Sequence, residues 1–129
     1  MTTISFDHTI IPSTDKDRTT AFYSDMLRLP AARPEGPFAA IDLDNQVSLY
    51  IGGWDSTVRP QHYAFLVSEE DFTAIYAQIL DRGVEHWADP HAKRPGEINH
   101  DDGGRGVYFR DPDANWLEVI TRRYGDTAP

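Results

Sequence analysis

The sequence contains no cysteine, which excludes disulfides, zinc–thiolate sites, iron–sulfur clusters and a thiol nucleophile. Long apolar runs are also missing, since the longest, Tyr63 to Val67, is far too short to span a bilayer. The N-terminal residues lack a basic region followed by an apolar stretch, so we expect no signal peptide. Positive charge is scarce, with 12 Lys and Arg against 21 Asp and Glu, whereas nucleic-acid binding needs clustered basic residues. We therefore expect a cytoplasmic protein that binds neither membrane nor nucleic acid.

The sequence predicts a hydrophobic core and two helices. Hydrophobic residues make up 40% of its 129 residues, enough for one folded domain. Apolar residues recur at helical spacing from Thr19 to Leu27 and from Phe72 to Leu80. Ser68 and Thr14 are the predicted N-caps of these helices, and Gly83 is the predicted end of the second.

The pattern around the helices occurs twice. Each predicted helix follows a strand-like segment that contains a histidine, His8 or His62, and is followed by further strands. These further strands are Phe38–Leu43 and Val47–Ile51 in the first half, and Val84–Trp87, Gly106–Arg110 and Trp116–Thr121 in the second. We expect one α+β domain over residues 1–129, made of module one (1–57), module two (58–124) and a tail (125–129). In it, two βαβββ modules form a curved mixed sheet around a cleft with the helices outside; a ferredoxin-like sandwich fits the same order of elements.

A polar segment from Asp89 to Gly104 has no counterpart in the first module. Loops of this length without secondary structure are uncommon and usually functional, so we expect a lid over a site. Asn99, His100 and Arg105 are predicted to contact the ligand, and His100 to act as an acid or base because histidine titrates near neutrality.

Basic residues also gather near this segment: Lys93, Arg94, Arg105 and Arg110. They either hold an anionic group of a substrate or pair with the many nearby aspartates. The remaining histidines, His86 and His91, are predicted to lie on the surface.

Glu118 is unusual because it lies in an apolar strand, where a carboxylate is rarely buried unless it is paired or bound to a metal. With His8 and His62, on two other strands, it would form a facial set of three ligands. Such a set suits a divalent cation: Fe, Mn, Ni, Co or Zn. The spacing leaves another interpretation open, in which the histidines are ordinary and Glu118 pairs with Arg122 or Arg123.

The segments Asp7–Ile10, Gln61–Phe65 and Val107–Asp113, followed by Glu118, resemble the vicinal oxygen chelate superfamily. This group includes glyoxalase I, extradiol dioxygenases, fosfomycin-resistance thiol transferases and bleomycin-binding proteins. The resemblance extends from Ile4 to Tyr124. It implies that His8, His62 and Glu118 are the metal ligands and that the hydroxyl of Tyr108 points at the metal.

The sequence departs from the superfamily pattern in two places. Ser48 and Tyr50 stand where glyoxalase I-like members carry a fourth ligand, a glutamate, so glyoxalase I activity is disfavoured. Ala114 stands where the family turn usually has glycine, and we expect the neighbouring Asn115 to take the left-handed conformation instead.

We therefore expect a metal-dependent dioxygenase, lyase or transferase whose small substrate binds the cation through adjacent oxygens. The alternative is a metal-free protein that sequesters an aromatic natural product or drug. The predicted site residues besides the metal ligands are Tyr108 and His100 for catalysis, and Tyr50, Asn99, Arg105 and Trp116 for substrate binding.

A homodimer is expected because exposed strand edges invite pairing and two-fold dimers are common. The resemblance implies that modules are often exchanged between chains. His8 would then come from one subunit, and His62 with Glu118 from the other.

Overall fold

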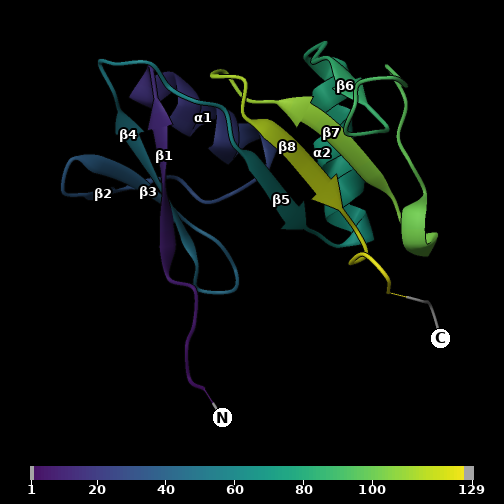
Figure 1. Ribbon diagram of the computed structural model, residues 1–129, viewed down its shortest axis with the longest axis horizontal. Coiled ribbons are helices and arrows are strands. Elements are labelled where there is room, and N and C mark those ends of the chain that lie inside the picture. Colours follow the sequence, from purple (N-terminus) through teal and green to yellow (C-terminus); the bar gives the residue numbers. More distant parts are fainter. Residues whose placement is uncertain (1, 127–129) are drawn as a thin grey trace. The chain divides into compact units, whose positions relative to one another are not determined.

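The computed structural model describes residues 2–126, and the chain divides into two units, Met1–Val58 and Arg59–Pro129 (Figure 1). Each unit follows the order strand, helix and three strands, which confirms the α+β class and the two βαβββ modules. The strands form two four-stranded mixed sheets, one in each unit. Among the residues described, no helix is long and apolar enough to cross a bilayer.

The first unit contains β1 (His8–Ser13), α1 (Lys16–Met26), β2 (Arg33–Glu35), β3 (Phe38–Asp42) and β4 (Ser48–Gly53), with the sheet order β1-β4-β3-β2. Strand β1 is parallel to β4, and the other pairs are antiparallel. The predicted N-cap Thr14 is wrong by one residue. Asp15 has the extended backbone of an N-cap, and its carboxylate accepts from the backbone N–H of Arg18 at 3.1 Å.

Alternation along these strands separates a core face from a polar face. Ile11, Ile41 and Ile51 are fully buried, as are Tyr23 and Met26 of α1, so one face of the sheet packs on the helix. The alternate residues occupy the opposite face, and they include His8, Tyr50 and Asp42.

The second unit contains β5 (His62–Leu66), α2 (Glu69–Asp81), β6 (His86–Trp87), the 3₁₀ helix η1 (Asp101–Gly103), β7 (Gly106–Arg110) and β8 (Trp116–Ile120), with the sheet order β5-β8-β7-β6. The predicted N-cap Ser68 is confirmed, because its hydroxyl accepts from the backbone N–H of Asp71 at 3.1 Å. Gly83 follows the helix with φ of 63°, a left-handed conformation that glycine adopts readily.

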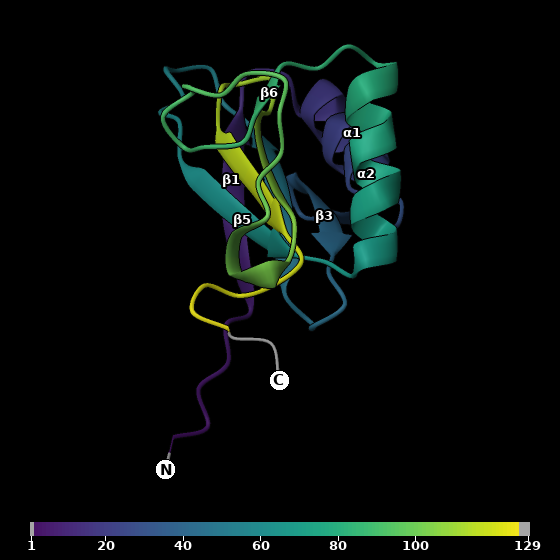
Figure 2. The ribbon, with the colours of Figure 1, turned by 90° about the vertical axis from the view of Figure 1, so that its right-hand side faces the viewer.

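In this unit α2 runs along one face of its sheet, where Phe72, Ile75 and Ile79 are buried (Figure 2). Leu117 and Val119 of β8 are fully buried on that face. The alternate residues of β7 and β8, among them Tyr108, Trp116 and Glu118, therefore occupy the face away from α2.

The segment after β6 contains regular structure, unlike the loop without secondary structure that the sequence predicts. It contains η1, and isolated bridges join Trp87 to Pro95 and Asn99 to Gly106. The buried amide of Asn99 donates to the carbonyl oxygen of Ala88 at 2.7 Å, which ties the segment to the end of β6. A Cβ atom at Gly106 would lie 2.8 Å from Oδ1 of Asn99, so the close approach requires glycine.

Two sequence predictions in this unit are wrong. The left-handed residue of the turn is Ala114, with φ of 68°, and not Asn115. Asn115 is held by Asp111, because the backbone N–H of Asn115 donates to Oδ1 of Asp111 at 2.9 Å and its Nδ2 donates to Oδ2 at 2.7 Å. His86 is buried instead of exposed. Its two ring nitrogens lie 3.0 Å from the carbonyl oxygen of Val84 and 3.2 Å from the hydroxyl of Tyr76.

Candidate metal-binding site

The carboxylate of Glu118 lies in the middle of β8 with only 2% of the residue exposed. Oε1 is 3.1 Å from Nε2 of His62 on β5, and Oε2 accepts a hydrogen bond of 2.9 Å from the hydroxyl of Tyr108 on β7. The hydroxyl of Tyr124 also donates to Oε2. Among the described residues these three side chains, and not Arg122 or Arg123, surround the carboxylate. The carboxyl group is buried, and its neighbours are two tyrosine hydroxyls and one imidazole.

The geometry of His62 decides which ring nitrogen is free. Nδ1 lies 2.8 Å from the carbonyl oxygen of Trp116, and because a carbonyl only accepts, we assign the proton to Nδ1. A neutral His62 therefore points the lone pair of Nε2 at Oε1 of Glu118, 3.1 Å away. Two acceptors at that distance repel each other unless a positive charge lies with them, either a proton or a metal cation.

The other oxygen of Glu118 is held by two tyrosines. The pKa of Tyr108 is raised by burial and by its hydrogen bonds to Tyr124 and Glu118. The pKa of Tyr124 is also raised, by burial and by Glu118. Both hydroxyls are therefore protonated at neutral pH and donate to Oε2, which leaves Oε1 to face His62.

Tyr124 is a site residue that the sequence interpretation missed. It lies six positions after Glu118, beyond the last strand, where no alternation indicates the direction of a side chain. The only signal available was an aromatic residue at the end of the segment that resembles the superfamily.

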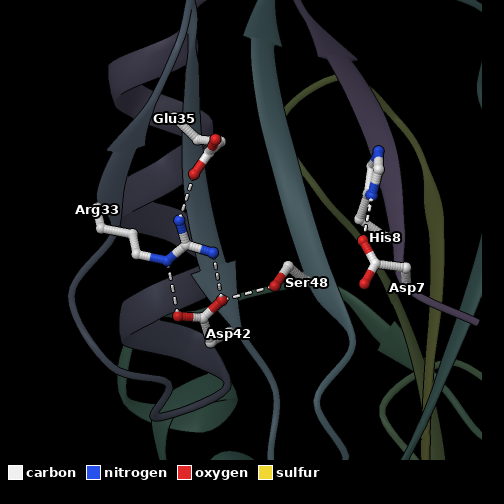
Figure 3. Close-up of polar contacts among 6 residues, drawn as sticks. All are labelled: Asp7, His8, Arg33, Glu35, Asp42 and Ser48. Atoms are coloured by element: carbon white, nitrogen blue, oxygen red, sulfur yellow. Dashed lines mark hydrogen bonds and ion pairs between the residues drawn. The ribbon is translucent and has the colours of Figure 1, made fainter.

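His8, in the first unit, repeats the arrangement of His62. Nδ1 lies 2.6 Å from Oδ2 of Asp7, an acceptor, so Nε2 is again the free nitrogen (Figure 3). Histidines that bind metals commonly donate their second nitrogen in this way to a carboxylate or a carbonyl. The imidazole is stacked on the ring of Tyr50, with centroids 4.3 Å apart and an angle of 15°.

A polar network lies next to His8 on the same sheet. Ser48 is opposite His8 in register, and its hydroxyl donates to Oδ1 of Asp42 at 2.6 Å (Figure 3). Arg33 donates to both oxygens of Asp42, at 2.9 and 3.0 Å, and to Glu35 at 2.6 Å. These hydrogen bonds, from Arg33 first and then from Ser48, lower the pKa of Asp42 to about 2.

Comparison with known proteins shows the family to which the chain belongs. Residues 5–119 match the Glyoxalase/Bleomycin resistance protein/Dioxygenase superfamily. The chain belongs to this superfamily.

Solved structures in that comparison include close relatives. Oxidase ChaP-H1 is 52% identical, with 95% of this chain and 98% of that chain covered and a TM-score of 0.92. Oxidase ChaP-H2 is 46% identical, with 98% and 100% covered and a TM-score of 0.95. The metallothiol transferase FosB of Shouchella clausii (strain KSM-K16) is 36% identical over 75 residues, which are 53% of this chain and 47% of that protein. The match therefore spans about half the length of this curated relative.

Within the superfamily fold, the structure brings only some of the predicted site residues together. His62, Glu118 and Tyr108 are in contact, and Trp116 is stacked beside Tyr108 with ring centroids 5.9 Å apart. Over residues 2–126, no three His, Asp or Glu side chains lie close enough together to hold a metal ion. His8 as the third ligand stays a prediction, as does Tyr50 as a substrate contact.

The predicted ligand contacts of the segment after β6 have other partners. The amide of Asn99 is bonded within the segment, and His100 is exposed. The guanidinium of Arg105 lies 4.5 Å from the ring centroid of Phe72 and donates to Glu69 at 2.8 Å, so it lies against α2. That any of the three touches substrate stays a prediction.

Proposed function

We propose that this superfamily member is a metal-dependent enzyme in which His8, His62 and Glu118 hold a divalent cation: Fe, Mn, Ni, Co or Zn. One observation carries the proposal. Nε2 of His62 faces Oε1 of Glu118 at 3.1 Å, an arrangement that needs a positive charge, which a metal cation would supply in place of a proton. A bound cation would supply Lewis acidity towards two adjacent oxygens of a small substrate.

The chain's own residues would prepare that site. The carbonyl oxygen of Trp116 fixes the proton of His62 on Nδ1, and Asp7 does the same for His8. Tyr108 and Tyr124 occupy Oε2 of Glu118, so Oε1 is the oxygen left for the cation. As the predicted catalytic acid, Tyr108 would turn its single O–H from Oε2 to a substrate oxygen, while Tyr124 keeps donating to Oε2.

Among the reactions open to this superfamily, we propose an oxidation. The support is the similarity to oxidases ChaP-H1 and ChaP-H2, which extends over nearly the whole of each chain. The similarity to the transferase FosB covers about half of each chain and supports transfer less strongly. Glyoxalase I activity remains disfavoured because Ser48 and Tyr50 stand where its fourth ligand is expected; Ser48 donates to Asp42 and the ring of Tyr50 is stacked on His8.

A metal-free binding protein is the second candidate. It is favoured by the aromatic rings of the second unit, where Trp116 is stacked on Tyr108 and the rings of Trp87 and Trp116 lie 5.1 Å apart. Such rings bind flat aromatic molecules without any reaction.

Metal analysis of protein purified without chelator separates the two candidates. We expect a stoichiometric divalent cation, and oxygen consumption when the iron-loaded protein is given 1,2-dihydroxynaphthalene as a probe with adjacent oxygens. A protein that contains no metal and takes up none of Fe, Mn, Ni, Co or Zn, but binds the probe, would support the binding protein and contradict the enzyme.

The predicted homodimer, with His8 from one subunit and Glu118 from the other, belongs to this proposal. In a mixed dimer of His8→Ala and Glu118→Ala chains, a shared site leaves one site intact, so metal binding and activity are retained. Sites within single chains would all carry a lesion, and the mixed dimer would then be inactive. Light scattering establishes the mass of the dimer before this test.

A further inference from the structure

Arg110, the last residue of β7, lies over two indole rings. Its Cζ atom is 5.0 Å from the ring centroid of Trp87 on β6 and 5.1 Å from that of Trp116 on β8. Contacts of this kind attract the guanidinium through its face and leave the N–H groups at its edge free to donate. An exposed side chain is thus held in one place by rings from two neighbouring strands.

The charge of Arg110 is not neutralised by a nearby acid. Within residues 2–126, no hydrogen bond or ion pair joins it to a carboxylate. The adjacent Asp111 is turned into the β7–β8 turn, where its Oδ1 accepts from the backbone N–H groups of Asp113 and Asn115 at 2.9 Å. Among the described residues, Arg110 therefore keeps its positive charge without an acidic partner, in a chain with a net charge of −9.

Arg110 shares a face of the sheet with the candidate metal ligands. Trp116 is opposite His62 on one side and opposite Arg110 on the other, so the three form one row across β5, β8 and β7. Neighbouring strands are about 4.8 Å apart, which puts Arg110 on the order of 10 Å from His62 along this row. Between them, the indole Nε1 of Trp116 is buried and has no hydrogen-bond partner among the described residues.

We propose that Arg110 binds an oxyanion of the substrate, such as a carboxylate, phosphate or phosphonate, and so selects organic anions. The planar guanidinium suits two parallel hydrogen bonds to such a group. The body of the substrate would lie along the row from Arg110 past Trp116 towards His62, with its charged group two strands from the cation. That the bound anion is a substrate depends on the proposed enzyme function. The anion site itself depends only on Arg110, Trp87 and Trp116.

Binding of 2-naphthoate tests this site, with 2-naphthamide as its uncharged counterpart. Titrations in the presence of a chelator, followed by the indole N–H signals in ¹H–¹⁵N spectra, need no metal. We expect naphthoate to shift the signals of Trp87 and Trp116, and naphthamide to bind about tenfold more weakly or worse. Arg110→Met should weaken naphthoate binding by a similar factor, Arg110→Lys by less, and Arg82→Met, a matched change at the C-cap of α2, not at all.

Three results would overturn the proposal: naphthoate that leaves both indole signals unchanged, equal binding of naphthoate and naphthamide, or equal binding by wild type and Arg110→Met. The dispersion of the same spectra shows that each variant is folded. A Mn²⁺ titration of the same proteins, after the chelator has been removed, tests the proposed function separately. Wild type that binds naphthoate but no Mn²⁺ would contradict the enzyme and leave the anion site standing.

Discussion

Tyr50 and Glu118 occupy the same place in the two sheets. Tyr50 on β4 is paired with Ile10 of the parallel strand β1, and Glu118 on β8 is paired with Ala64 of the parallel strand β5. In the first unit this position carries an aromatic ring stacked on His8, whereas in the second it carries a buried carboxylate facing His62. One residue thus decides which of the two similar units carries a buried carboxyl group at this position.

A second pair of equivalent positions differs in the sign of its charge. Asp42 is opposite Ser48 at the end of β3, and Arg110 is opposite Trp116 at the end of β7. Asp42 is enclosed by Arg33, while Arg110 lies on two tryptophans without an acid among the described residues. At these equivalent positions the first unit pairs its acid with an arginine, whereas the second carries an arginine that the described residues leave without an acid.

The largest effect is expected where the two units differ most. Glu118→Ala removes a proposed direct ligand and should lower the affinity for Mn²⁺ by more than about 100-fold, since loss of a supporting partner alone costs 10–100-fold. Tyr50→Phe, at the equivalent position, keeps the ring on His8 and should change the affinity little. Calorimetric titration measures both; an equal loss in the two variants would break the comparison.

The β7–β8 turn should be more sensitive to mutation than the β3–β4 turn. Asn115 is buried, bonded to Asp111, and accepts from the backbone N–H of Gln61 at 2.7 Å, so Asn115→Ala should cost roughly 2 kcal/mol. Val47 is equivalent, because its carbonyl accepts from Leu43 as that of Asn115 accepts from Asp111. Val47→Ala should cost less, and urea unfolding that finds the reverse order would contradict this account.

Both turns contain a residue in the left-handed conformation, Gln46 with φ of 66° and Ala114 with φ of 68°. Glycine adopts this conformation without steric cost, so Gln46→Gly and Ala114→Gly should each stabilise the protein by about 1 kcal/mol. The melting temperature would rise by a few degrees. Similar gains in both variants would show that the two turns are alike in backbone, and a loss of stability in either would contradict the shared conformation.

The smallest effect is a dependence on pH that belongs to the first unit. Asp42 has a pKa near 2 in the folded chain against a usual 3.8, so the unfolded chain binds its proton more readily. The stability that Asp42 adds relative to Asp42→Asn is therefore complete above about pH 5 and is lost as the pH falls towards 2. Urea midpoints of both proteins at pH 6 and pH 2.5 measure the difference. The difference in urea midpoint should be modest and should decrease with added salt, because the ion pair between Asp42 and Arg33 is exposed.

Patterns along the chain predicted the parts of the fold that depend on neighbouring residues. Helical spacing and the N-cap Ser68 predict the position of α2. The occurrence of a carboxylate in an apolar strand marks Glu118 as an unusual residue. The sequence pattern predicts Thr14 as the N-cap of α1 but does not separate it from its neighbour Asp15, because both side chains can accept from the first turn of a helix. The neighbouring Ser13 is instead buried and donates to Thr19 at 2.9 Å, which places Asp15 at the cap.

Contacts between distant segments explain what the sequence could not predict. Ala114 is left-handed because Asn115 is bound to Asp111 and Gln61, and this outweighs the intrinsic preference of asparagine. Tyr124 reaches Glu118 from outside any strand, so no periodicity marks it. The contacts of Arg105 with Glu69 and Phe72 of α2 join segments more than 30 residues apart, so the sequence pattern does not indicate them.

The imidazole nitrogen signals of His62 test most directly whether the second unit offers a cation site. In metal-free protein at neutral pH, we expect Nδ1 to be protonated. Addition of Zn²⁺ should move the Nε2 signal to that of a metal-bound nitrogen in wild type and leave it unchanged in Glu118→Ala. A wild-type Nε2 that keeps a proton before and after Zn²⁺ is added would contradict the account.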